Sequence, residues 1–293
     1  MRVTGIGGGH GLACTLAAAR RYASEVAAVV TVADDGGSSG RLTRALGIPP
    51  PGDIRNCLVA LAEDAALARL YQHRFSGGPL RGHALGNFVI AALTESTGDF
   101  AEAVAQAGEL VGARGVVHPA TTELVSLMAC VDGATVRGQR AVGQSAGPIQ
   151  AVYLEPSNPC ANERACEAIL DADQVILGPG SLFTSVIATL LVPGVRRALA
   201  ETAAQRVFVC NTRMQRGETR GLDTAAHVHA LLAHAGPDPI DAVVVQHPEL
   251  VPDGVGLDPA ALGFLGVRVV EADVATPSGA HDPERLAWVL GSL

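Results

Sequence analysis

The sequence predicts an α/β protein in which a mostly parallel sheet carries helices on both faces. Val3–Ile6 is typical of a short strand, Gly7–Gly11 of a turn, Leu12–Tyr22 of an alanine-rich helix and Val26–Val32 of a second strand. Strand, turn, helix and strand within about thirty residues indicate a βαβ unit, whose right-handed crossover joins parallel strands. The second strand is a near-continuous run of valine and alanine, as expected where a sheet is covered on both faces.

The same order of elements returns later in the chain. Helical periodicity predicts helices at residues 53–71, 84–97 and 100–111, and apolar runs predict strands at residues 174–177, 207–210 and 242–245. Between these groups, short turn-separated strands are expected at residues 116–117, 124–127, 135–136 and 149–152. We therefore expect a single α/β domain over residues 1–293, with a small β-rich insertion at about residues 115–155.

Composition excludes several classes of function. The formal net charge is −8, and all 21 basic residues are arginines, so a P-loop lysine and a Schiff-base lysine are both excluded. No basic cluster marks a nucleic-acid partner. No apolar run approaches the roughly 20 residues of a membrane span, and the first residues resemble a strand rather than a signal peptide. We expect a cytoplasmic protein without a membrane span.

Cysteine and histidine spacing does not suggest a metal centre. The six cysteines include no C-x-x-C pair and lie mostly in apolar surroundings, so we expect reduced thiols rather than disulfides or zinc ligands. His227, His229 and His234 lack the i, i+4 spacing that would place two ligands on one helix face. They are predicted to be surface or capping residues.

A glycine-rich loop follows the first strand, at the edge of a parallel sheet where ligands bind. With Gly8, Gly9 and Gly11 around His10, and Leu12 opening the helix, backbone N–H groups can approach an anion, and the helix dipole favours negative charge. The loop fits neither G-x-G-x-x-G nor the Walker pattern, so no redox cofactor is expected. We interpret it as a phosphate cradle; the alternative is a tight turn.

The second strand also ends in an unusual loop, residues 34–41. Asp34 and Asp35 are adjacent carboxylates, which repel unless they meet a sugar hydroxyl, an arginine or a cation, and such oxygen ligands suit Mg²⁺ bridging phosphates. The remaining candidates are the backbone donors and the guanidinium that could hold a phosphate, namely Gly36, Gly37, Ser38, Ser39 and Arg41. The alternative is a solvated turn with Asp34 as a helix cap.

Polar residues also gather at two predicted helix entrances. Asp53 is expected at the N-cap of the helix that begins there, with Arg55 and Asn56 in its first turn. At the second entrance His83 and Asn87 are four residues apart and share a face. Either of these two could equally be a satisfied structural group.

A third strand end repeats the anion-binding pattern. Gly178, Pro179, Gly180 and Ser181 precede a helix whose first turn carries Thr184, although Ser181 could be a plain N-cap. The segment after residue 210 is too polar for a simple turn, and its candidate binding residues are Asn211, Gln215, Glu218 and Thr219.

Taken together, these segments resemble the YvcK branch of the CofD-like superfamily, often called gluconeogenesis factors. The resemblance rests on residues 7–12, 31–42, 50–61, 82–87, 178–185, 215–219 and 281–282, and it spans nearly the whole chain in the expected order. His10 stands where that family usually carries threonine.

The resemblance implies a three-layer Rossmann-like fold, a homodimer, and a nucleotide site at the strand ends. It implies binding of a UDP-sugar such as UDP-N-acetylglucosamine, and a role in gluconeogenic growth, cell-wall metabolism and cell shape, acting through a regulatory protein partner. The other branch transfers a phospholactyl group from a nucleotide-activated donor with Mg²⁺. A Mg²⁺-dependent enzyme similar to 2-phospho-L-lactate transferase is therefore the alternative to a non-catalytic regulator.

Overall fold

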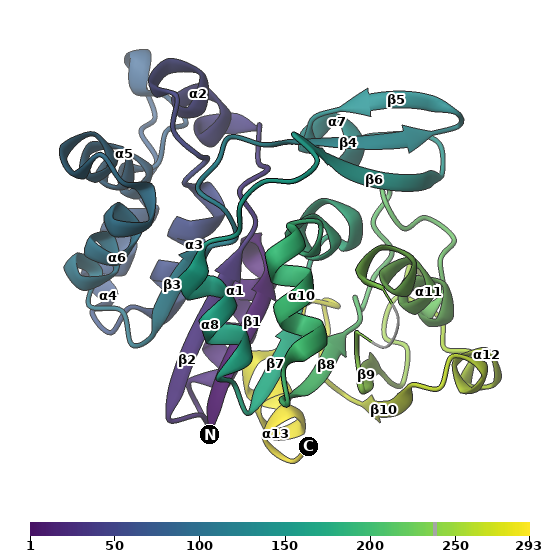
Figure 1. Ribbon diagram of the computed structural model, residues 1–293. Coiled ribbons are helices and arrows are strands. Elements are labelled where there is room, and N and C mark those ends of the chain that lie inside the picture. Colours follow the sequence, from purple (N-terminus) through teal and green to yellow (C-terminus); the bar gives the residue numbers. More distant parts are fainter. Residues whose placement is uncertain (237–238) are drawn as a thin grey trace.

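The computed structural model describes residues 1–236 and 239–293, which form one large and one small sheet with helices around them (Figure 1). The large sheet has seven strands in the order β10-β9-β8-β7-β1-β2-β3, and each neighbouring pair is parallel. Its strands are β1 (Arg2–Gly7), β2 (Glu25–Val30), β3 (Val116–Pro119), β7 (Gln174–Leu177), β8 (Gln205–Val209), β9 (Ala242–Gln246) and β10 (Arg268–Ala272). The predicted parallel α/β sheet is confirmed.

Helices cover both faces of this sheet, as predicted. One face carries α1 (Gly9–Ala19), α3 (Gly52–Leu61), α4 (Ala65–Gln72), α5 (Leu85–Thr97), α6 (Phe100–Val111) and α13 (Pro283–Gly291). The other carries α8 (Glu163–Leu170), the π-helical turn η2 (Leu182–Ile187) with its continuation α9 (Ala188–Leu190), α10 (Pro193–Glu201), α11 (Thr224–Ala235) and α12 (Pro259–Phe264). Strand alternation explains the two cores: the buried neighbours Val29 and Val30 lie in different clusters, and so do Ile176 and Leu177.

The long helix predicted at residues 53–71 is wrong, because the structure breaks it into α3 and α4. The Asp64 carboxylate accepts hydrogen bonds from the backbone N–H groups of Ala66 and Leu67, at 2.6 and 3.3 Å, and thereby caps a new helix. Arg20 donates to the carbonyls of Ala60 and Ala62, at 3.1 and 3.2 Å, so the end of α3 is satisfied by the side chain of the residue that follows α1. The apolar periodicity of the sequence continues across the break between α3 and α4, so periodicity alone does not reveal that break.

The small sheet is antiparallel and lies over the carboxyl ends of the large one (Figure 1). It contains β4 (Ser126–Val131), β5 (Ala134–Arg137) and β6 (Ile149–Glu155), in the order β5-β4-β6, with the short helix α7 (Gln139–Gly143) between β5 and β6. The insertion therefore exists but begins later than residue 115. The predicted strand at residues 116–117 belongs to β3, which pairs with β2 in the large sheet, and residues 124–125 lie outside any strand.

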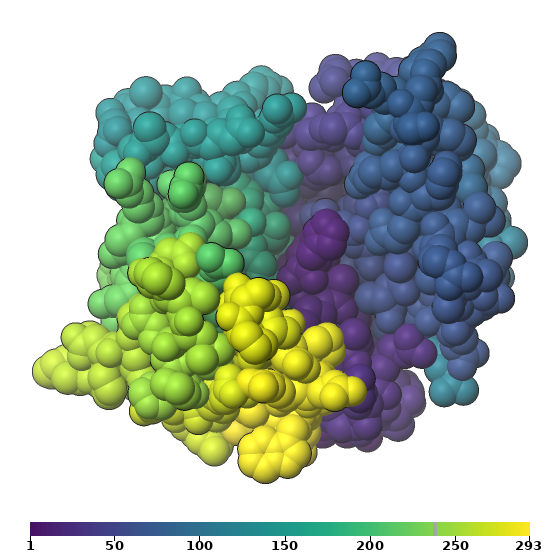
Figure 2. Space-filling view, turned by 180° about the vertical axis from the view of Figure 1, so that it is seen from behind, coloured from purple at the N-terminus to yellow at the C-terminus, as the bar shows by residue number. Residues whose placement is uncertain are grey.

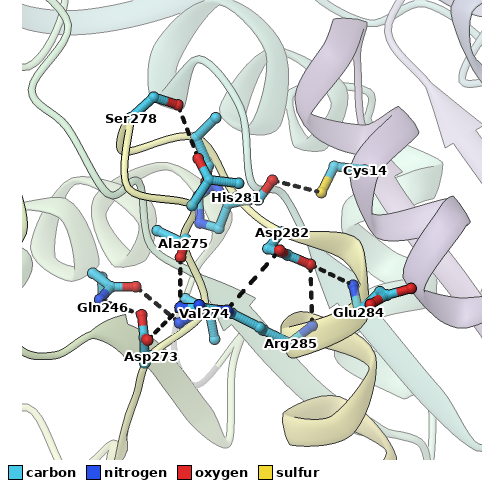
Figure 3. A network of polar contacts seen from close by, with 12 residues as sticks. Cys14, Gln246, Asp273, Val274, Ala275, Ser278, His281, Asp282, Glu284 and Arg285 are labelled. Atoms are coloured by element: carbon cyan, nitrogen blue, oxygen red, sulfur yellow. Dashed lines mark hydrogen bonds and ion pairs between the residues drawn. The ribbon is translucent and has the colours of Figure 1, made fainter.

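The segment before α13 ties the C-terminal helix to the sheet (Figure 3). Gln246 at the end of β9 donates to Asp273 at 3.0 Å and accepts from the backbone N–H of Val274 at 2.8 Å. Arg285 forms an ion pair with Asp273 and donates to the carbonyl of Ala275 at 2.9 Å. These bonds fix the polypeptide that connects β10 to α13.

No single helix among residues 1–236 and 239–293 has the length and apolar composition of a membrane span. One pair of helices, Leu182–Leu190 with Pro193–Glu201, is apolar enough when taken together, but it is bent by 77° at the break. Residues 182–190 are all buried.

Candidate functional site

A cavity of about 400 Å³ opens at the carboxyl ends of β1, β2 and β7. The strand order reverses between β1 and β7, and such switch points are where open α/β sheets bind ligands. The cavity is lined by Gly8, Gly9, His10, Gly11, Asp34, Asp53, Gln139, Gly180, Ser181, Thr184, Ser185 and Gln215. Seen from behind, the molecule is hollowed between its blue and its teal and green parts, with N-terminal residues in purple at the floor (Figure 2).

The glycine loop after β1 is held tightly against its neighbours. A Cβ atom on Gly8 would lie 2.5 Å from the Oδ2 atom of Asp53, and one on Gly11 would lie 2.3 Å from the carbonyl oxygen of Pro179. Gly9 has a φ of +63°, a conformation that favours glycine. The glycines are therefore needed for the approach of Asp53 and of the third loop, as well as for exposing the backbone to the cavity.

The two adjacent carboxylates are separated in the structure. Asp34 lines the cavity, whereas Oδ1 of Asp35 accepts a hydrogen bond of 2.9 Å from the backbone N–H of Arg140, at the start of α7. The acid that faces Asp34 is Asp53, which also lines the cavity. Asp53 lies inside the first turn of α3 rather than at its N-cap, which is Pro51. The acid pair of this cavity is thus Asp34 and Asp53, in place of the predicted Asp34 and Asp35.

The environment of this pair opposes ionisation. Burial raises the pKa of Asp53 to about 7, and the charge of Asp34 contributes, while Arg55 and the Gly9 N–H oppose the rise. Burial also raises the pKa of Asp34, against hydrogen bonds from Gly36 and Ser39. Two carboxylates that repel each other at one wall of a cavity are stabilised by a cation between them.

The residues present fit a magnesium ion bound together with a ligand. Mg²⁺ is commonly held by one or two carboxylates plus phosphate oxygens and water, and Asp34 and Asp53 supply the two carboxylates here. Among the described residues no group of three or more His, Cys, Asp or Glu side chains is arranged to hold a metal alone. A bound phosphate would therefore complete the coordination.

Behind the acid pair lies a buried polar network between α2 (Gly37–Leu46), α3 and α5. Arg55, only 2% exposed, donates to Oδ1 of Asn87 at 2.8 Å and to Oδ1 of Asn56 at 2.6 Å. Asn87 donates to the Ser38 hydroxyl at 2.9 Å, which in turn contacts Nδ1 of His83 at 2.9 Å. These predicted site residues do not line the cavity, but the charge of Arg55 lowers the pKa of both acids.

Arg41 is also placed away from the cavity. Its guanidinium is exposed and donates to the carbonyl of Arg81 at 2.9 Å. The Ser39 hydroxyl hydrogen-bonds to Asp34 and lies against Gly52, where an added Cβ would be 2.2 Å away. Gly36 donates to Asp34 at 2.9 Å. The second loop therefore contributes chiefly Asp34 to the cavity wall.

The helix that begins at the cavity, α1, has no side-chain cap. The N-cap residues of α1 and α2, Gly8 and Gly36, make no side-chain cap. Six other helices begin with an Asp or Asn whose side chain accepts from the backbone, and these are α4, α6, α8, α11, α12 and α13. Backbone donors at the start of α1, where residues 8–11 line the cavity, are thus not filled by a side-chain cap and can serve an anion.

The third loop, residues 178–181, is different, because a carboxylate of the protein itself binds backbone N–H groups at the start of η2. Glu218 accepts from the backbone N–H groups of Phe183 and Thr184, both at 3.1 Å, and from the Thr184 hydroxyl at 2.6 Å. The predicted anion site at η2 is therefore occupied by Glu218. Gly180, Ser181 and Thr184 still line the cavity, but two peptide donors of this turn, those of Phe183 and Thr184, already bind Glu218.

The loop after β8 is hydrogen-bonded to the third loop at this side of the cavity. Asn211 accepts from the Gly180 N–H at 3.2 Å, Gln215 donates to the Ser181 hydroxyl at 3.0 Å, and the buried Thr219 hydroxyl accepts from the Gln215 N–H at 2.8 Å. Of these, Gln215 reaches the cavity. Gly178 and Pro179 are buried beneath it.

Sequence reasoning missed Gln139, which reaches the cavity from α7 of the insertion. Its amide donates to the carbonyl of Thr184 at 2.9 Å. Nothing local in the sequence identifies Gln139, because only the fold of the insertion brings α7 over the strand ends. Ser185, also missed as a site residue, follows Thr184 directly and could have been included.

The histidine prediction was only partly right. His229 is exposed, but His227 is fully buried and its Nδ1 lies 2.7 Å from the carbonyl of Asp223. His234 contacts the carbonyl of Ala230 through Nδ1 and accepts from the Val152 N–H through Nε2, so it joins α11 to β6. The described cysteines form no disulfide with one another.

Comparison with known proteins gives consistent matches. The family model described as 2-phospho-L-lactate transferase CofD matches residues 3–275. The protein of Halalkalibacterium halodurans named Gluconeogenesis factor is 42% identical over 252 residues, which make up 85% of this chain and 78% of that protein. A relative from Deinococcus radiodurans is 42% identical over 314 residues, which cover all of this chain but only 66% of the relative.

A solved structure shows the same fold. The crystal structure of a UPF0052 family member from Bacillus halodurans superimposes with a TM-score of 0.95 at 36% sequence identity, and the match covers 99% of this chain and 98% of that one.

Proposed function

Because this chain belongs to the CofD family and is similar to the gluconeogenesis factors over nearly its whole length, we propose that it binds a nucleotide sugar as a non-catalytic regulator. The ligand class is that of UDP-N-acetylglucosamine. The regulated processes are gluconeogenic growth, cell-wall metabolism and cell shape.

One observation carries this proposal: the cavity at the switch point joins the uncapped start of α1 to an acid pair. The start of α1 offers backbone donors to a diphosphate, and Asp34 and Asp53 would hold the Mg²⁺ that such a diphosphate brings. Bound in this way, Mg²⁺ would neutralise the phosphates and the two acids. Ser181, Gln139 and Gln215 add neutral hydrogen-bonding groups at the opposite wall, which suit hydroxyl groups.

A Mg²⁺-dependent phospholactyl transferase remains the second candidate. The acid pair favours it, since carboxylates that bind Mg²⁺ could also stabilise the charge that develops on a transferring phosphoryl group. The two candidates differ in whether a nucleotide-activated donor is consumed when an alcohol acceptor is supplied.

The test is a thermal-shift panel of UDP-N-acetylglucosamine, UDP-glucose, GDP, GTP, NAD and buffer, each with and without Mg²⁺. At a hundredfold excess over Kd, binding adds roughly 2.7 kcal/mol to the free energy of unfolding, or roughly 5 °C in Tm for a chain of this size. Stabilisation by UDP-sugars is the expected result. A Mg²⁺-dependent preference for guanine nucleotides would direct the work to transferase assays.

Adjacent residues provide a matched pair of variants. Asp34→Asn should remove the Mg²⁺-dependent part of the shift, because Asp34 lines the cavity, whereas Asp35→Asn should retain it, because Asp35 faces α7. Equal losses in the two variants would contradict the assignment of the acid pair. No stabilisation of the wild type by any UDP-sugar would exclude the proposed ligand.

A further inference from the structure

A second cavity lies on the other side of the segment that carries Gln215. It has a volume of about 650 Å³ and is lined by Met214, Arg216, Arg220, Gly221 and Asp253, from the loops that follow β8 and β9 (Figure 1). That volume is within the range of small-molecule sites. Gln215 lines the first cavity while its chain neighbours Met214 and Arg216 line the second, so the two cavities share one wall.

The walls of this second cavity are held by the protein itself. The Met214 N–H donates to the carbonyl of Asp253 at 2.8 Å, and the Gly221 N–H donates to the sulfur of Met214 at 3.2 Å. Arg213 donates to the Asp253 carboxylate at 3.1 Å and to the carbonyl of Ser278 at 3.1 Å. Three loops are thereby joined, so the cavity exists before any ligand arrives.

The charges in the cavity are unbalanced. Its one acidic lining residue, Asp253, already forms an ion pair with Arg213 at 3.1 Å. Arg216 and Arg220 are exposed, and neither has an ion-pair or hydrogen-bond partner in the part of the chain that the structure describes. Two free guanidinium groups therefore border one cavity in a chain whose net charge is −8.

We propose that this cavity is a second binding site, for a small phosphate-bearing anion held by Arg216 and Arg220. The planar guanidinium fork matches the geometry of a phosphate and can bind it through two parallel hydrogen bonds. The volume leaves room for the organic part of a phosphate monoester. The site is distinct from the first cavity and does not depend on the function proposed there.

A ligand at this site would act on the first cavity through the turn at residues 215–219. Within that turn the Glu218 and Thr219 N–H groups donate to the carbonyl of Gln215, at 3.0 and 2.9 Å. Glu218 caps η2 and Gln215 binds Ser181. Ordering Arg216 and Arg220 around an anion should therefore favour the arrangement of Gln215 and Glu218 seen here, and the two ligands should bind with coupled affinities.

The experiment titrates the purified full chain with inorganic phosphate and, separately, with glucose 6-phosphate, at ionic strength kept constant with NaCl, and follows Tm. The test variant is Arg216→Gln with Arg220→Gln. The control is Arg69→Gln with Arg268→Gln, which removes the same charge from exposed arginines on α4 and β10. We expect saturable stabilisation of the wild type and of the control, and a Kd raised by about tenfold or more in the test variant.

The outcomes separate this site from the first one. Absence of saturable binding to the wild type, or the same affinity in the wild type and both variants, would overturn the proposal. The UDP-N-acetylglucosamine response is measured on the same proteins without added phosphate, so that coupling to an anion bound at the second site does not contribute. If the test variant loses it as well, the two arginines belong to the first site and the second does not exist.

Phosphate binding that persists when no nucleotide sugar binds would uphold this site while excluding the other proposal. A preference for glucose 6-phosphate over inorganic phosphate would identify a monoester as the ligand class.

Discussion

Asp53 illustrates a residue whose charge costs stability. Its carboxylate is half-buried beside Asp34, and burial together with that neighbour raises its pKa to about 7. In the unfolded chain the same group titrates near 4. Folded protein therefore keeps the proton over a range of pH where the unfolded chain releases it, so stability falls as pH rises from about 4 to about 7 and stays low above that.

Asp53→Asn should consequently stabilise the protein at pH 8 in Mg²⁺-free buffer with EDTA. The gain is at most roughly 4 kcal/mol, and it should vanish at pH 4, where the wild type carries the proton. The amide oxygen can still accept from the Gly9 N–H. Urea unfolding at the two pH values measures the difference, and the Mg²⁺-dependent ligand response should be lost. Destabilisation of the variant by the same amount at both pH values would contradict the raised pKa of Asp53.

A substitution at Gly11 tests whether the first and third loops must pack closely against each other. It lies in α1 without a positive φ, so alanine there would ordinarily favour the helix. Its Cβ would however lie 2.3 Å from the carbonyl of Pro179. Gly11→Ala should therefore lower the free energy of unfolding by about 1–3 kcal/mol and weaken ligand binding. Gly77→Ala is the control, since nothing lies within 4 Å of its added Cβ. Chemical denaturation of the two variants gives the comparison, and equal stabilities would refute the contact.

Individual elements show what could be predicted from the sequence. The helix at residues 100–111 is confirmed to the residue, because Asp99 caps its start and Gly112, at a φ of +64°, ends it. The helix at residues 53–71 failed where Asp64 caps α4 inside a continuous apolar pattern. β3 was assigned to the insertion because four residues do not reveal which sheet they join.

The site was predictable at the level of loops more than of side chains. Glycine loops at strand ends located the cavity, since the carboxyl ends of parallel strands meet at one edge of a sheet. Which acid faces Asp34 depends on how α3 packs against α1, and that contact is not local in sequence. The same holds for Glu218, whose carboxylate caps a turn more than thirty residues earlier.

A substitution of His281 tests how the C-terminal segment contributes to the stability of the fold. Its Nε2 lies 3.2 Å from the carbonyl of Cys210, and its own carbonyl accepts from the Cys14 thiol, a contact shown in Figure 3. Burial lowers the pKa of His281 to about 4, against the hydrogen bond to Cys210. The unfolded chain binds the proton near pH 6.5, so stability is complete above that value and is lost as pH falls toward 4.

His281→Gln should remove this part of the acid sensitivity. The wild type is expected to lose at most roughly 3 kcal/mol more than the variant between pH 7 and pH 4. Denaturant unfolding of the wild type and the variant at both pH values gives the change in free energy of unfolding for each protein. The difference between these two changes excludes the contribution of the carboxylates, because both proteins share it. His229→Gln, on the exposed side of α11, should behave as the wild type. Identical pH profiles for wild type and His281→Gln would show that burial of this imidazole does not control its protonation.

At the scale of the whole molecule, the first cavity is assembled from both halves of the chain. Its N-terminal side comes from residues 8–11, Asp34 and Asp53. The remainder comes from Gln139, Gly180, Ser181, Thr184, Ser185 and Gln215. The insertion contributes through α7, which is attached to the second loop by Asp35 and to η2 by Gln139. A ligand that bridges these segments stabilises only the states in which all of them are in place.

Hydrogen exchange should therefore slow at several distant segments together when UDP-N-acetylglucosamine and Mg²⁺ are added. Protection is expected in three segments that carry lining residues of this cavity, namely residues 8–11, α7 with Gln139, and residues 180–185. Exchange in α13 should not change, since it contributes no residue to the cavity. Mass spectrometry of peptic fragments measures all of these at once. Protection limited to residues 211–221 and 251–255 would instead place the nucleotide sugar in the second cavity, between Arg216 and Arg220, and would contradict the bridging arrangement.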